Sequence, residues 1–569
     1  MKTVIVGGVA GGASAAARLR RLDEHAQIVL FERGEYISFA NCGLPYYISG
    51  TIAKQSDLTL QTPESFHKRF AVDVRIQSEV VCIHPQEKTV EVLDHKGGKT
   101  YTESYDKLIL APGAMPVLPP IPGADLDRVF TLRTIPDTLR IKAFVEEKKP
   151  RRAVVIGGGF IGLELAENLK NAGLDVTIAE LSDHVIAPLD YDMASVVHSY
   201  LESKGLHLLL GRAVNAITEK DGALAVQLDG CELGTDMVVL SVGVRPESKL
   251  ARDAGLLVND IGAVVTDNQM RTSDSDIYAV GDVTEADNFM TGGKSYVPLA
   301  GPANKQGRIA ADNICGIEST YTGTQGSAVI QLFDMTIACT GLNERAARAA
   351  NADFETSVIY SPSHATYYPD ARNMFIKILF EKQTGRLLGA QLAGFEGVDK
   401  RCDVFATAIR AGMTVDGLTH LELCYAPPYS SAKDPVNMAG FAAQNILHGL
   451  VQVFHWQDVA SLPRDGSVTL LDVRTPTEHA RGSIDGFVNL PLDSLRDRLD
   501  TLDPDKPVYV HCQSGLRSYI ACRILTQNGF TCFNLSGGYV FYSAVVKDNS
   551  PDPAQRCLNV ETQQPQTCP

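Results

Sequence analysis

The chain has 569 residues, which is too many for a single hydrophobic core, so we expect about three to five domains. Hydrophobic residues make up 44% and charged residues 21% of the chain, as in ordinary soluble proteins. The chain contains no run of about eighteen or more apolar residues, the length needed to span a membrane. The net charge of −15 argues against nucleic acid as a partner.

Twelve cysteines are scattered along the chain. They include no CxxC pair and no His/Cys cluster at zinc spacing, so no metal site is predicted. The first eight residues are apolar but turn into glycines at once, which indicates a strand rather than a signal peptide. We expect a cytoplasmic protein that holds reduced thiols, one or two of them reactive.

The N-terminal segment has the pattern of a dinucleotide-binding βαβ unit. A strand over 2–6 is followed by glycines, a helix from about 11 to 22, and a second strand over 27–31 that ends in Glu32. Glycines let the backbone approach a pyrophosphate at the helix N-terminus, and the acid accepts hydrogen bonds from ribose hydroxyls. Val9 stands where the second glycine usually lies, so tight strand–helix packing is the alternative interpretation.

A second copy of this unit lies further along the chain. A strand over 152–156 leads into a full GxGxxG at 157–162, and a strand over 175–179 ends in Glu180. Two units predict two bound dinucleotides. The acid at the second strand end, with no arginine in 181–183, favours NADH over NADPH.

In chain order, the motifs GxxxGG, APG, GxGxxG, GVRP and YAVGD resemble those of the two-dinucleotide flavoprotein disulfide reductases. The resemblance implies FAD in the first unit and NAD(P)H in the second. It also implies that Asp282 hydrogen-bonds the flavin ribityl chain, although Asp282 as a helix N-cap is the alternative. The implied cofactor-binding residues are Gly7, Gly8, Ala10, Gly11, Gly12, Glu32, Arg33, Ala111, Pro112, Gly113, Gly157, Gly159, Ile161, Gly162, Glu180, Gly243, Gly281, Asp282 and Ala300.

Cys42 is the candidate redox centre. Most dithiol reductases carry a second cysteine nearby, where this chain has Tyr47, so the partner sulfur of Cys42 must come from elsewhere. Cys42 lies in the pattern Ser-Phe-x-x-Cys-Gly-x-Pro at 38–45. Within the family, a lone cysteine in this pattern is shared by NADH oxidases, NADH peroxidases and coenzyme A disulfide reductases. The oxidases and peroxidases carry a histidine at the position of Ala10, which argues against an oxidase or peroxidase function without excluding it.

The segment from about 326 to 445 has an α+β pattern, with strands near 328–333 and 374–380 and helices over 398–411 and 435–447. The resemblance implies that this segment is the family's dimerisation domain and that it supplies residues to the active site of the other subunit.

Tyr367, Tyr425 and Lys433 lie on predicted loops of that domain and match residues that the coenzyme A reductases place opposite their cysteine. A phenol can donate a proton to a leaving thiolate. Aromatic packing at the subunit interface is the alternative role for each tyrosine.

The last part of the chain resembles a rhodanese. A strand within 467–474 ends in Asp-x-Arg, a strand over 508–511 precedes Cys512, and a helix is predicted over 518–527. The loop from Cys512 has the six-residue size of sulfur-transfer enzymes, whose cysteine carries sulfane sulfur as a persulfide. Backbone N–H groups, a helix N-terminus and Arg517 are expected to stabilise its thiolate.

Basic and polar residues near Cys42 could grip the phosphates of coenzyme A, although a solvated charged face is the alternative. The implied coenzyme A site contains Ser14, Arg18, Arg21, Ser38, Asn41, Arg69 and Lys433.

The predicted architecture is α/β, with two Rossmann-like domains, an α+β dimerisation domain and a rhodanese α/β domain. The expected boundaries are 1–118 with 245–325 for FAD, 119–244 for NAD, 326–446 for dimerisation, 452–548 for the rhodanese and 549–569 for a disordered tail. Cys522 and Cys532 are interpreted as structural and Cys557 and Cys568 as exposed tail thiols.

The predicted enzyme is a homodimer with shared active sites. Electrons pass from NADH to FAD to a Cys42–coenzyme A mixed disulfide, and Cys512 carries sulfane sulfur. The substrate is a coenzyme A persulfide, a polysulfide, inorganic sulfur or coenzyme A disulfide. One alternative is an NADH oxidase or peroxidase that cycles Cys42 through sulfenic acid, and another is a separate thiosulfate sulfurtransferase or docking role for the rhodanese.

Overall fold

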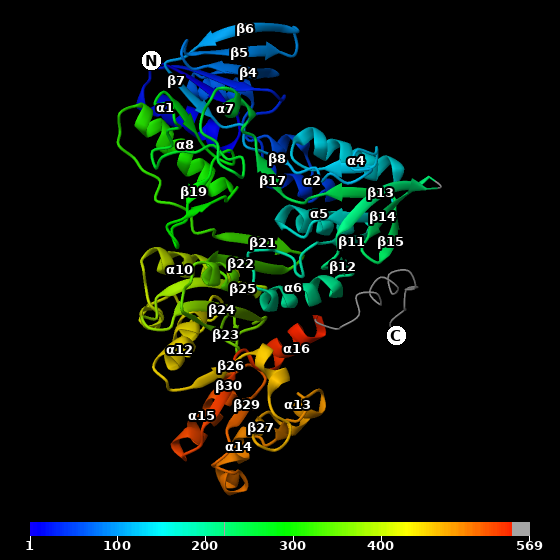
Figure 1. Cartoon of the computed structure of the whole chain (residues 1–569), viewed down its shortest axis with the longest axis vertical. Coiled ribbons are helices and arrows are strands. Elements are labelled where there is room, and N and C mark those ends of the chain that lie inside the picture. The colour runs from blue at the N-terminus through cyan, green and yellow to red at the C-terminus, as the bar shows by residue number, and fades with distance from the viewer. Residues whose placement is uncertain (221, 549–569) are drawn as a thin grey trace. The chain divides into compact units, whose positions relative to one another are not determined.

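The structure is a computed structural model that describes residues 1–220 and 222–548 (Figure 1). The chain forms two compact units, one of residues 1–181 and 212–324 and the other of residues 182–211 with the chain from 325 onward. The predicted tail, with Cys557 and Cys568, lies outside the described residues. No helix within the described ranges is both long and apolar enough to cross a membrane.

The first unit begins with a parallel sheet in the order β18-β7-β1-β2-β3. Its strands are β1 (Lys2–Val6), β2 (Gln27–Glu32), β3 (Asp73–Ile76), β7 (Lys107–Leu110) and β18 (Ile277–Ala279). Helix α1 (Ala10–Leu22) packs against α8 (Ala300–Ile314) beside this sheet. A Cβ on Gly307 of α8 would lie 2.3 Å from the Gly11 carbonyl oxygen of α1, so glycine permits this close approach. Leu19, Ile5 and Ile109 belong to the buried core beside these helices.

The second parallel sheet of this unit repeats the pattern. Strands β11, β10, β16 and β9 are neighbours in that order, and their bounds are β9 (Val129–Thr131), β10 (Arg152–Ile156), β11 (Asp175–Ala179) and β16 (Met237–Leu240). The helices that belong to it are α4 (Ile135–Lys148) and α5 (Phe160–Asn171). Strands β8 (Ala114–Pro116) and β17 (Val244–Pro246) pair antiparallel where the chain enters and leaves this part.

Smaller elements complete the first unit. Two antiparallel sheets consist of β4 (Ser78–His84), β5 (Thr89–Asp94) and β6 (Lys99–Ser104), and of β13 (Val214–Lys220), β14 (Ala223–Leu228) and β15 (Cys231–Thr235). The remaining elements are α2 (Leu44–Ser49), α3 (Pro63–Phe70), α7 (Lys249–Asp253), β19 (Ala286–Asp287) and β20 (Lys294–Ser295).

The second unit contains an antiparallel sheet in the order β21-β22-β25-β24-β23. Its strands are β21 (Ala328–Leu332), β22 (Met335–Gly341), β23 (Phe354–Pro362), β24 (Asn373–Glu381) and β25 (Leu387–Gly394). The accompanying elements are α6 (Tyr191–Ser203), β12 (His207–Leu209), α9 (Glu344–Ala349), α10 (Val398–Arg410), α11 (Val415–Thr419) and α12 (Pro435–Leu447). The predicted helices over 398–411 and 435–447 are therefore confirmed to within one residue.

The C-terminal part of the second unit is a parallel sheet in the order β26-β30-β29-β27-β28. Its strands are β26 (Gln452–Phe454), β27 (Thr469–Asp472), β28 (Val488–Asn489), β29 (Val508–His511) and β30 (Cys532–Leu535), and its helices are α13 (Pro476–Ala480), α14 (Leu492–Leu495), α15 (Leu516–Gln527) and α16 (Gly538–Asp548). Helix α15 begins two residues before its predicted start. The predicted α/β architecture is confirmed.

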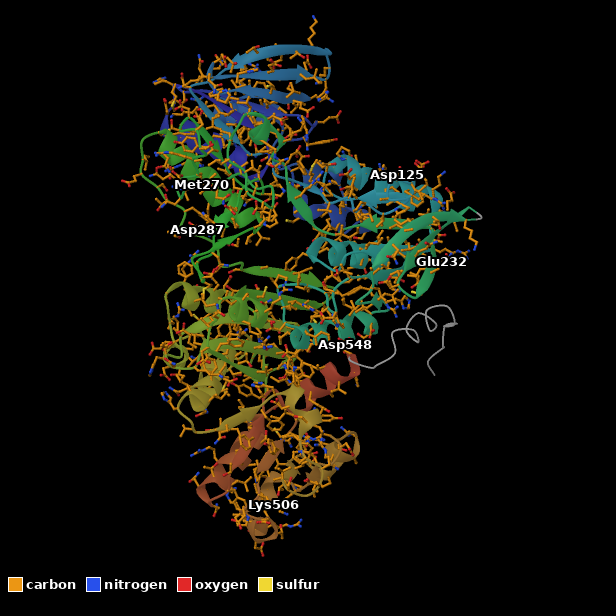
Figure 2. All side chains as sticks on the ribbon, viewed as in Figure 1. Asp125, Glu232, Met270, Asp287, Lys506 and Asp548 are labelled. Carbon is orange, nitrogen blue, oxygen red and sulfur yellow. The ribbon has the colours of Figure 1, made fainter. Side chains whose placement is uncertain are left out.

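Helix α16 is anchored on α6. Asp548, labelled in Figure 2, ends α16 and accepts hydrogen bonds from Tyr191 at 2.8 Å and Ser195 at 3.2 Å. The imidazole Nδ1 of buried His198 also lies 2.8 Å from the Asp548 carboxylate. Helix α16 is therefore joined to α6 by polar contacts as well as by packing.

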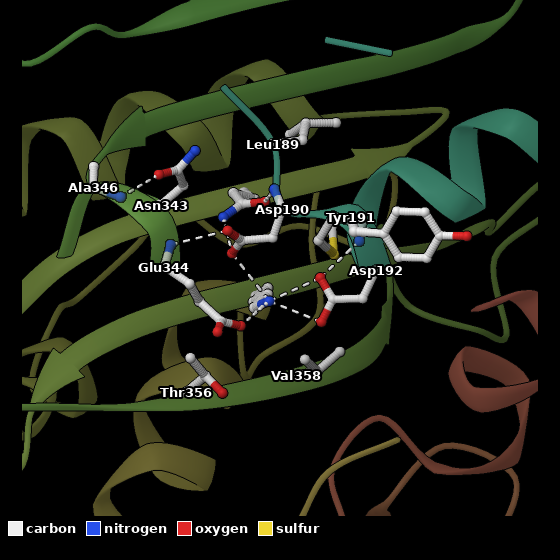
Figure 3. Close-up of polar contacts among 12 residues, drawn as sticks. Leu189, Asp190, Tyr191, Asp192, Asn343, Glu344, Ala346, Thr356 and Val358 are labelled. Atoms are coloured by element: carbon white, nitrogen blue, oxygen red, sulfur yellow. Dashed lines mark hydrogen bonds and ion pairs between the residues drawn. The ribbon is translucent and has the colours of Figure 1, made fainter. Parts of the chain in front are cut away.

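A buried lysine joins α6 to the antiparallel sheet (Figure 3). The Lys377 ammonium lies 2.8 Å from both Asp192 oxygens, 2.6 Å from Glu344 Oε1 and 3.0 Å from Asp190 Oδ2, with its side chain 1% exposed. The three carboxylates raise the pKa of Lys377 although burial opposes this, while burial raises the pKa of Asp192. A buried charge is tolerated only with such partners.

Candidate active site

The first glycine turn is shaped by backbone contacts that only glycine permits. Gly7 has φ +99°, and a Cβ there would lie 2.1 Å from the carbonyl oxygen of Ala111. A Cβ on Gly12 would lie 1.9 Å from the Gly7 carbonyl oxygen. The N–H of Gly8 donates to Glu32 Oε2 at 3.0 Å, which fixes the acid at the end of β2. Close packing thus explains why positions 7 and 12 are glycines. The Glu32 carboxylate and the start of α1 lie beside the turn.

The second turn repeats this geometry and leaves one glycine open. Gly157 has φ +110°, and a Cβ on Gly162 would lie 2.1 Å from the Gly157 carbonyl oxygen. The Gly158 N–H donates to Glu180 Oε2 at 2.6 Å. A Cβ on Gly159 would meet no heavy atom within 4 Å, so the backbone there is accessible to a ligand at the N-terminus of α5. Both turns fit a dinucleotide.

Asp282 and Asn41 are polar groups that a polyol cofactor could satisfy. Burial raises the pKa of Asp282, and the Arg133 guanidinium, 3.7 Å from Oδ2, opposes that rise. The buried Oδ1 of Asn41 accepts no hydrogen bond from the part of the chain that the structure describes. Asp282 fits the ribityl hydroxyls that the resemblance predicts for it. The N-cap alternative for Asp282 is not observed, because the next described helix, α8, begins only at Ala300.

The other predicted cofactor residues lie at or near the ends of strands and helices of the first unit. Arg33 forms an ion pair with Glu247, with one N···O distance of 2.9 Å, and Ile161 is 41% exposed. Ala10 and Gly11 open α1, Ala300 opens α8, Ala111, Pro112 and Gly113 follow β7, Gly243 precedes β17, and Gly281 follows β18.

Cys42 lies in a short 3₁₀ turn, Asn41–Gly43, directly before α2. The pKa of its thiol is raised by desolvation first and then by the carboxylates of Glu164 and Asp282, while the positive charge of Arg133 opposes the rise. The protein's own groups thus favour the thiol over the thiolate, so a positive or hydrogen-bonding ligand group would assist its ionisation.

Glu164 and Tyr46 were not anticipated from the sequence. The Tyr46 hydroxyl donates to Glu164 Oε1 at 3.1 Å where α2 packs on α5. Burial raises the pKa of Glu164 to about 7, so this carboxyl can give or take a proton near neutral pH. The only sequence signals were the position of Tyr46 one helical turn after Cys42 and of Glu164 two residues after the glycine motif.

The predicted coenzyme A residues have mixed surroundings. Arg18 Nε donates to Asp312 Oδ1 at 2.7 Å and Ser14 Oγ donates to Asn304 Oδ1 at 2.6 Å, so both already have protein partners. The exposed members of the set are Arg21, Arg69 and Lys433. Ser38 has φ +49° and Asn41 lies beside Cys42.

The structure brings Tyr367 and Tyr425 together. Their hydroxyls are 2.8 Å apart on two loops, and the side chains are 74% and 48% exposed in the single chain. Buried Arg401 orders both loops, because its Nη2 donates to the Ser363 carbonyl at 2.9 Å and to Asp434 Oδ2 at 2.9 Å. The hydrogen bond with Tyr425 raises the pKa of Tyr367.

Cys512 lies at the base of the loop between β29 and α15 and is fully buried. Its sulfur accepts hydrogen bonds from the Gly515 N–H at 3.1 Å and the Ser518 hydroxyl at 3.3 Å. Arg517 donates to both oxygens of Glu478, at 2.8 and 2.6 Å, which lowers the pKa of Glu478 to about 2. One backbone N–H and one hydroxyl of the loop and the following helix therefore donate to the Cys512 sulfur.

The strand end with the Asp-x-Arg motif supports this loop. Arg474 is buried and donates to Asp472 Oδ2 at 2.7 Å, to the Gly482 carbonyl at 2.7 Å and to Gln513 Oε1 of the loop at 3.3 Å. Burial lowers the pKa of neighbouring His511 to about 4, so this imidazole stays neutral. No group of His, Cys, Asp or Glu within the described ranges could hold a metal ion.

Comparison with known families agrees with this geometry. The model of the pyridine nucleotide-disulphide oxidoreductases matches residues 1–307, and the model of that family's dimerisation domain matches residues 327–435. The chain belongs to the pyridine nucleotide-disulphide oxidoreductases. A rhodanese-like domain matches residues 455–544, so this member of the family carries a C-terminal rhodanese domain. The family binds FAD and a pyridine nucleotide.

Three similar proteins illustrate the range within the family. The structure of reduced CoADR-RHD from Bacillus anthracis is 49% identical with a TM-score of 0.94, covering 96% of this chain and 98% of that chain. A NAD-dependent persulfide reductase from A. fulgidus is 38% identical with a TM-score of 0.90, covering 95% and 100%. An NADH oxidase of Methanocaldococcus jannaschii is 35% identical over 440 residues, covering 77% of this chain and 98% of its own length.

Proposed function

We propose that this enzyme is an NADH-dependent, coenzyme A-using reductase of persulfide or polysulfide sulfur. The observation that carries the proposal is the combination of a lone Cys42, in the unit that contains both dinucleotide turns, with a buried Cys512 whose sulfur accepts two hydrogen bonds. The similarity to CoADR-RHD and to a NAD-dependent persulfide reductase over nearly the whole chain supports it.

We assign the cofactors to the domains that the sequence predicts. Residues of 1–118 and 245–325 would hold FAD, and residues of 119–244 would hold NADH, with Glu180 accepting from the ribose 2′-hydroxyl. When bound, these two groups supply a pair of electrons to the sulfur of Cys42.

The chemistry of Cys42 is a thiol exchange. The Cys42 thiolate attacks the inner sulfur of a coenzyme A persulfide, the S–S bond of the persulfide breaks, and hydrosulfide leaves. Cys42 then holds coenzyme A as a mixed disulfide, and two electrons convert that disulfide to two thiolates. Glu164, with a pKa of about 7, and its hydrogen-bond donor Tyr46 would give or take the proton at this sulfur.

The second subunit of a homodimer would complete the site. The dimerisation domain presents Tyr367 and Tyr425 as a hydrogen-bonded and solvent-accessible pair, which suits donation of a proton to a leaving thiolate. Lys433, Arg21 and Arg69 are the exposed cations available for coenzyme A phosphates. Cys512 would carry sulfane sulfur, with Arg517 beside it.

Mass spectrometry of the denatured, oxidised protein tests the proposal. We expect coenzyme A in disulfide linkage to the peptide that contains Cys42, and its release on reduction with NADH. Coenzyme A linked elsewhere, or bound to no cysteine, would contradict the proposal.

A second function is an NADH oxidase that cycles Cys42 through sulfenic acid, and the similarity to an NADH oxidase favours it. Under that function, oxygen would consume NADH without any sulfur substrate, and a sulfenic-acid probe would label Cys42. Under the reductase function, NADH consumption would require the sulfur substrate.

A further inference from the structure

The carbonyl oxygen of Gly515, in the Cys512 loop, is approached by three hydrogen-bond donors. The Tyr519 N–H of α15 donates to it at 3.0 Å, the Ser518 hydroxyl lies 3.1 Å away, and the Asn534 amide nitrogen Nδ2 lies 3.3 Å away. A carbonyl oxygen has only two lone pairs, so two of these donors are enough to satisfy it. The third donor is available to another acceptor.

The Ser518 hydroxyl is the donor that has another acceptor. Its oxygen lies 3.3 Å from the Cys512 sulfur, which also accepts the Gly515 N–H at 3.1 Å. A hydroxyl has one proton, so it cannot donate to the sulfur and to the Gly515 carbonyl at the same time. The hydrogen bond to the sulfur therefore depends on how well other donors occupy that carbonyl.

Asn534 is held where its amide reaches the Gly515 carbonyl. It lies on β30, between two neighbouring strands, and its backbone is paired with Val453 of β26 and Val510 of β29. The residue is 8% exposed, and its Oδ1 has no hydrogen-bond partner among the residues that the structure describes. An unsatisfied buried amide oxygen costs stability, so packing alone does not explain an asparagine at this position.

We propose that Asn534 is a positioning residue for sulfur loading of Cys512, because its amide occupies the Gly515 carbonyl and thereby directs the Ser518 proton to the sulfur. The inference rests on the proposed role of Cys512 as the sulfur carrier.

The step that Asn534 assists is the attack of the Cys512 thiolate on inorganic polysulfide. With hydrogen disulfide, HS–SH, a bond forms between the Cys512 sulfur and one sulfur of HS–SH, the S–S bond of HS–SH breaks, and HS⁻ leaves. The product is a Cys512 persulfide. Hydrogen bonds from the Gly515 N–H and the Ser518 hydroxyl stabilise the attacking thiolate.

Replacing Asn534 by leucine keeps a side chain of similar size and removes its donor. One lone pair of the Gly515 carbonyl is then open, so the Ser518 hydroxyl turns to it and the thiolate loses one of its two donors. A hydrogen bond to an ionised group corresponds to about one pH unit. The variant should therefore load sulfur about tenfold more slowly at low pH and reach the parent's rate at high pH. Damage to the fold would instead slow loading at every pH.

The test follows persulfide formation on the peptide that contains Cys512, by mass spectrometry. The full-length holoprotein is treated with inorganic polysulfide in the absence of NADH, from about pH 6 to pH 9. We expect the midpoint of the pH–rate profile of Asn534→Leu to lie about one unit above that of the parent. Asn534→Ala, which removes the same amide without adding bulk, is the second variant and should give the same shift.

A double variant shows whether Asn534 acts through Ser518. Ser518→Ala removes the hydroxyl itself and should raise the midpoint at least as much as Asn534→Leu. Combining the two substitutions should raise it no further than Ser518→Ala alone, because the amide has no hydroxyl left to direct.

Asn528→Ala is the matched control. The Asn528 amide also donates to a backbone carbonyl, that of Ile524 at 2.8 Å, but it lies at the C-terminal end of α15. This variant should keep the parent's pH profile.

An unchanged midpoint in the Asn534 variants, additive shifts in the double variant, or an equal shift in Asn528→Ala would each overturn the inference. A parent that forms no persulfide on Cys512 would contradict both the inference and the proposed sulfur-carrying role. Coenzyme A linkage to Cys42 is measured separately and decides the reductase function alone.

Discussion

Replacing Glu164 by glutamine removes a carboxyl that the fold holds at a cost. The pKa of Glu164 is raised from 4.5 to about 7 by burial, so above pH 7 the folded state carries a charge that it disfavours. Below pH 4.5 the carboxyl is protonated in both states and costs nothing. Between pH 4.5 and about 7 the carboxyl is ionised in the unfolded chain but mostly protonated in the folded protein, so the free energy of unfolding falls as the pH rises.

The rise in the pKa of Glu164 from 4.5 to about 7 sets the size of the effect. At ~1.4 kcal/mol per unit, the penalty is about 3 kcal/mol at pH 8 and about 1 kcal/mol at pH 5.5, both as upper limits. Glutamine keeps an acceptor for the Tyr46 hydroxyl, so Glu164→Gln should unfold at a higher temperature than the parent, and more so at pH 8. It should also turn over NADH more slowly, because the titrating group is lost.

Thermal unfolding of both holoproteins at the two pH values measures this difference. Glu87→Gln, an exposed glutamate, is the matched control and should leave the melting temperature unchanged at both. A variant no more stable than the parent at pH 8, or one stabilised equally at both pH values, would refute the reasoning.

Three further predictions concern other parts of the chain. Lys377→Met leaves three carboxylates without their buried cation and should reduce the free energy of unfolding by about 3–5 kcal/mol in urea titrations, with partial recovery as the pH falls. Tyr425→Phe should slow turnover by about 10- to 100-fold in steady-state assays, whereas Tyr429→Phe, also on an exposed loop, should not. Arg517→Gln should slow sulfur loading of Cys512 in a persulfide assay. The salt bridge from Arg517 lowers the pKa of Glu478 to about 2. The stability that this pair contributes is therefore present above about pH 4.5 and lost as the pH falls toward 2.

The dinucleotide turns could be predicted from the sequence because their requirement is local and steric. Gly7 and Gly157 must adopt positive φ against a carbonyl oxygen, which few other residues allow. The Cys512 loop was predictable for a similar reason, since the Gly515 N–H that donates to Cys512 and the helix that follows are contiguous with it in the chain.

Contacts between distant segments could not be predicted in this way. Glu164 acquires its pKa from burial where α2 packs on α5, and Tyr46 lies 118 residues away in sequence. The role of Arg401 in ordering two loops likewise depends on tertiary packing. Residue type and spacing alone carry no signal for such environments.

The measurement that tests the central claim most directly is NADH-driven sulfide release from coenzyme A persulfide by the parent and by Cys42→Ser. We expect the parent to release one sulfide for each NADH consumed under anaerobic conditions, and the variant to lose this activity while retaining the FAD spectrum. Sulfide release that persists in Cys42→Ser at the parent's rate would contradict the account.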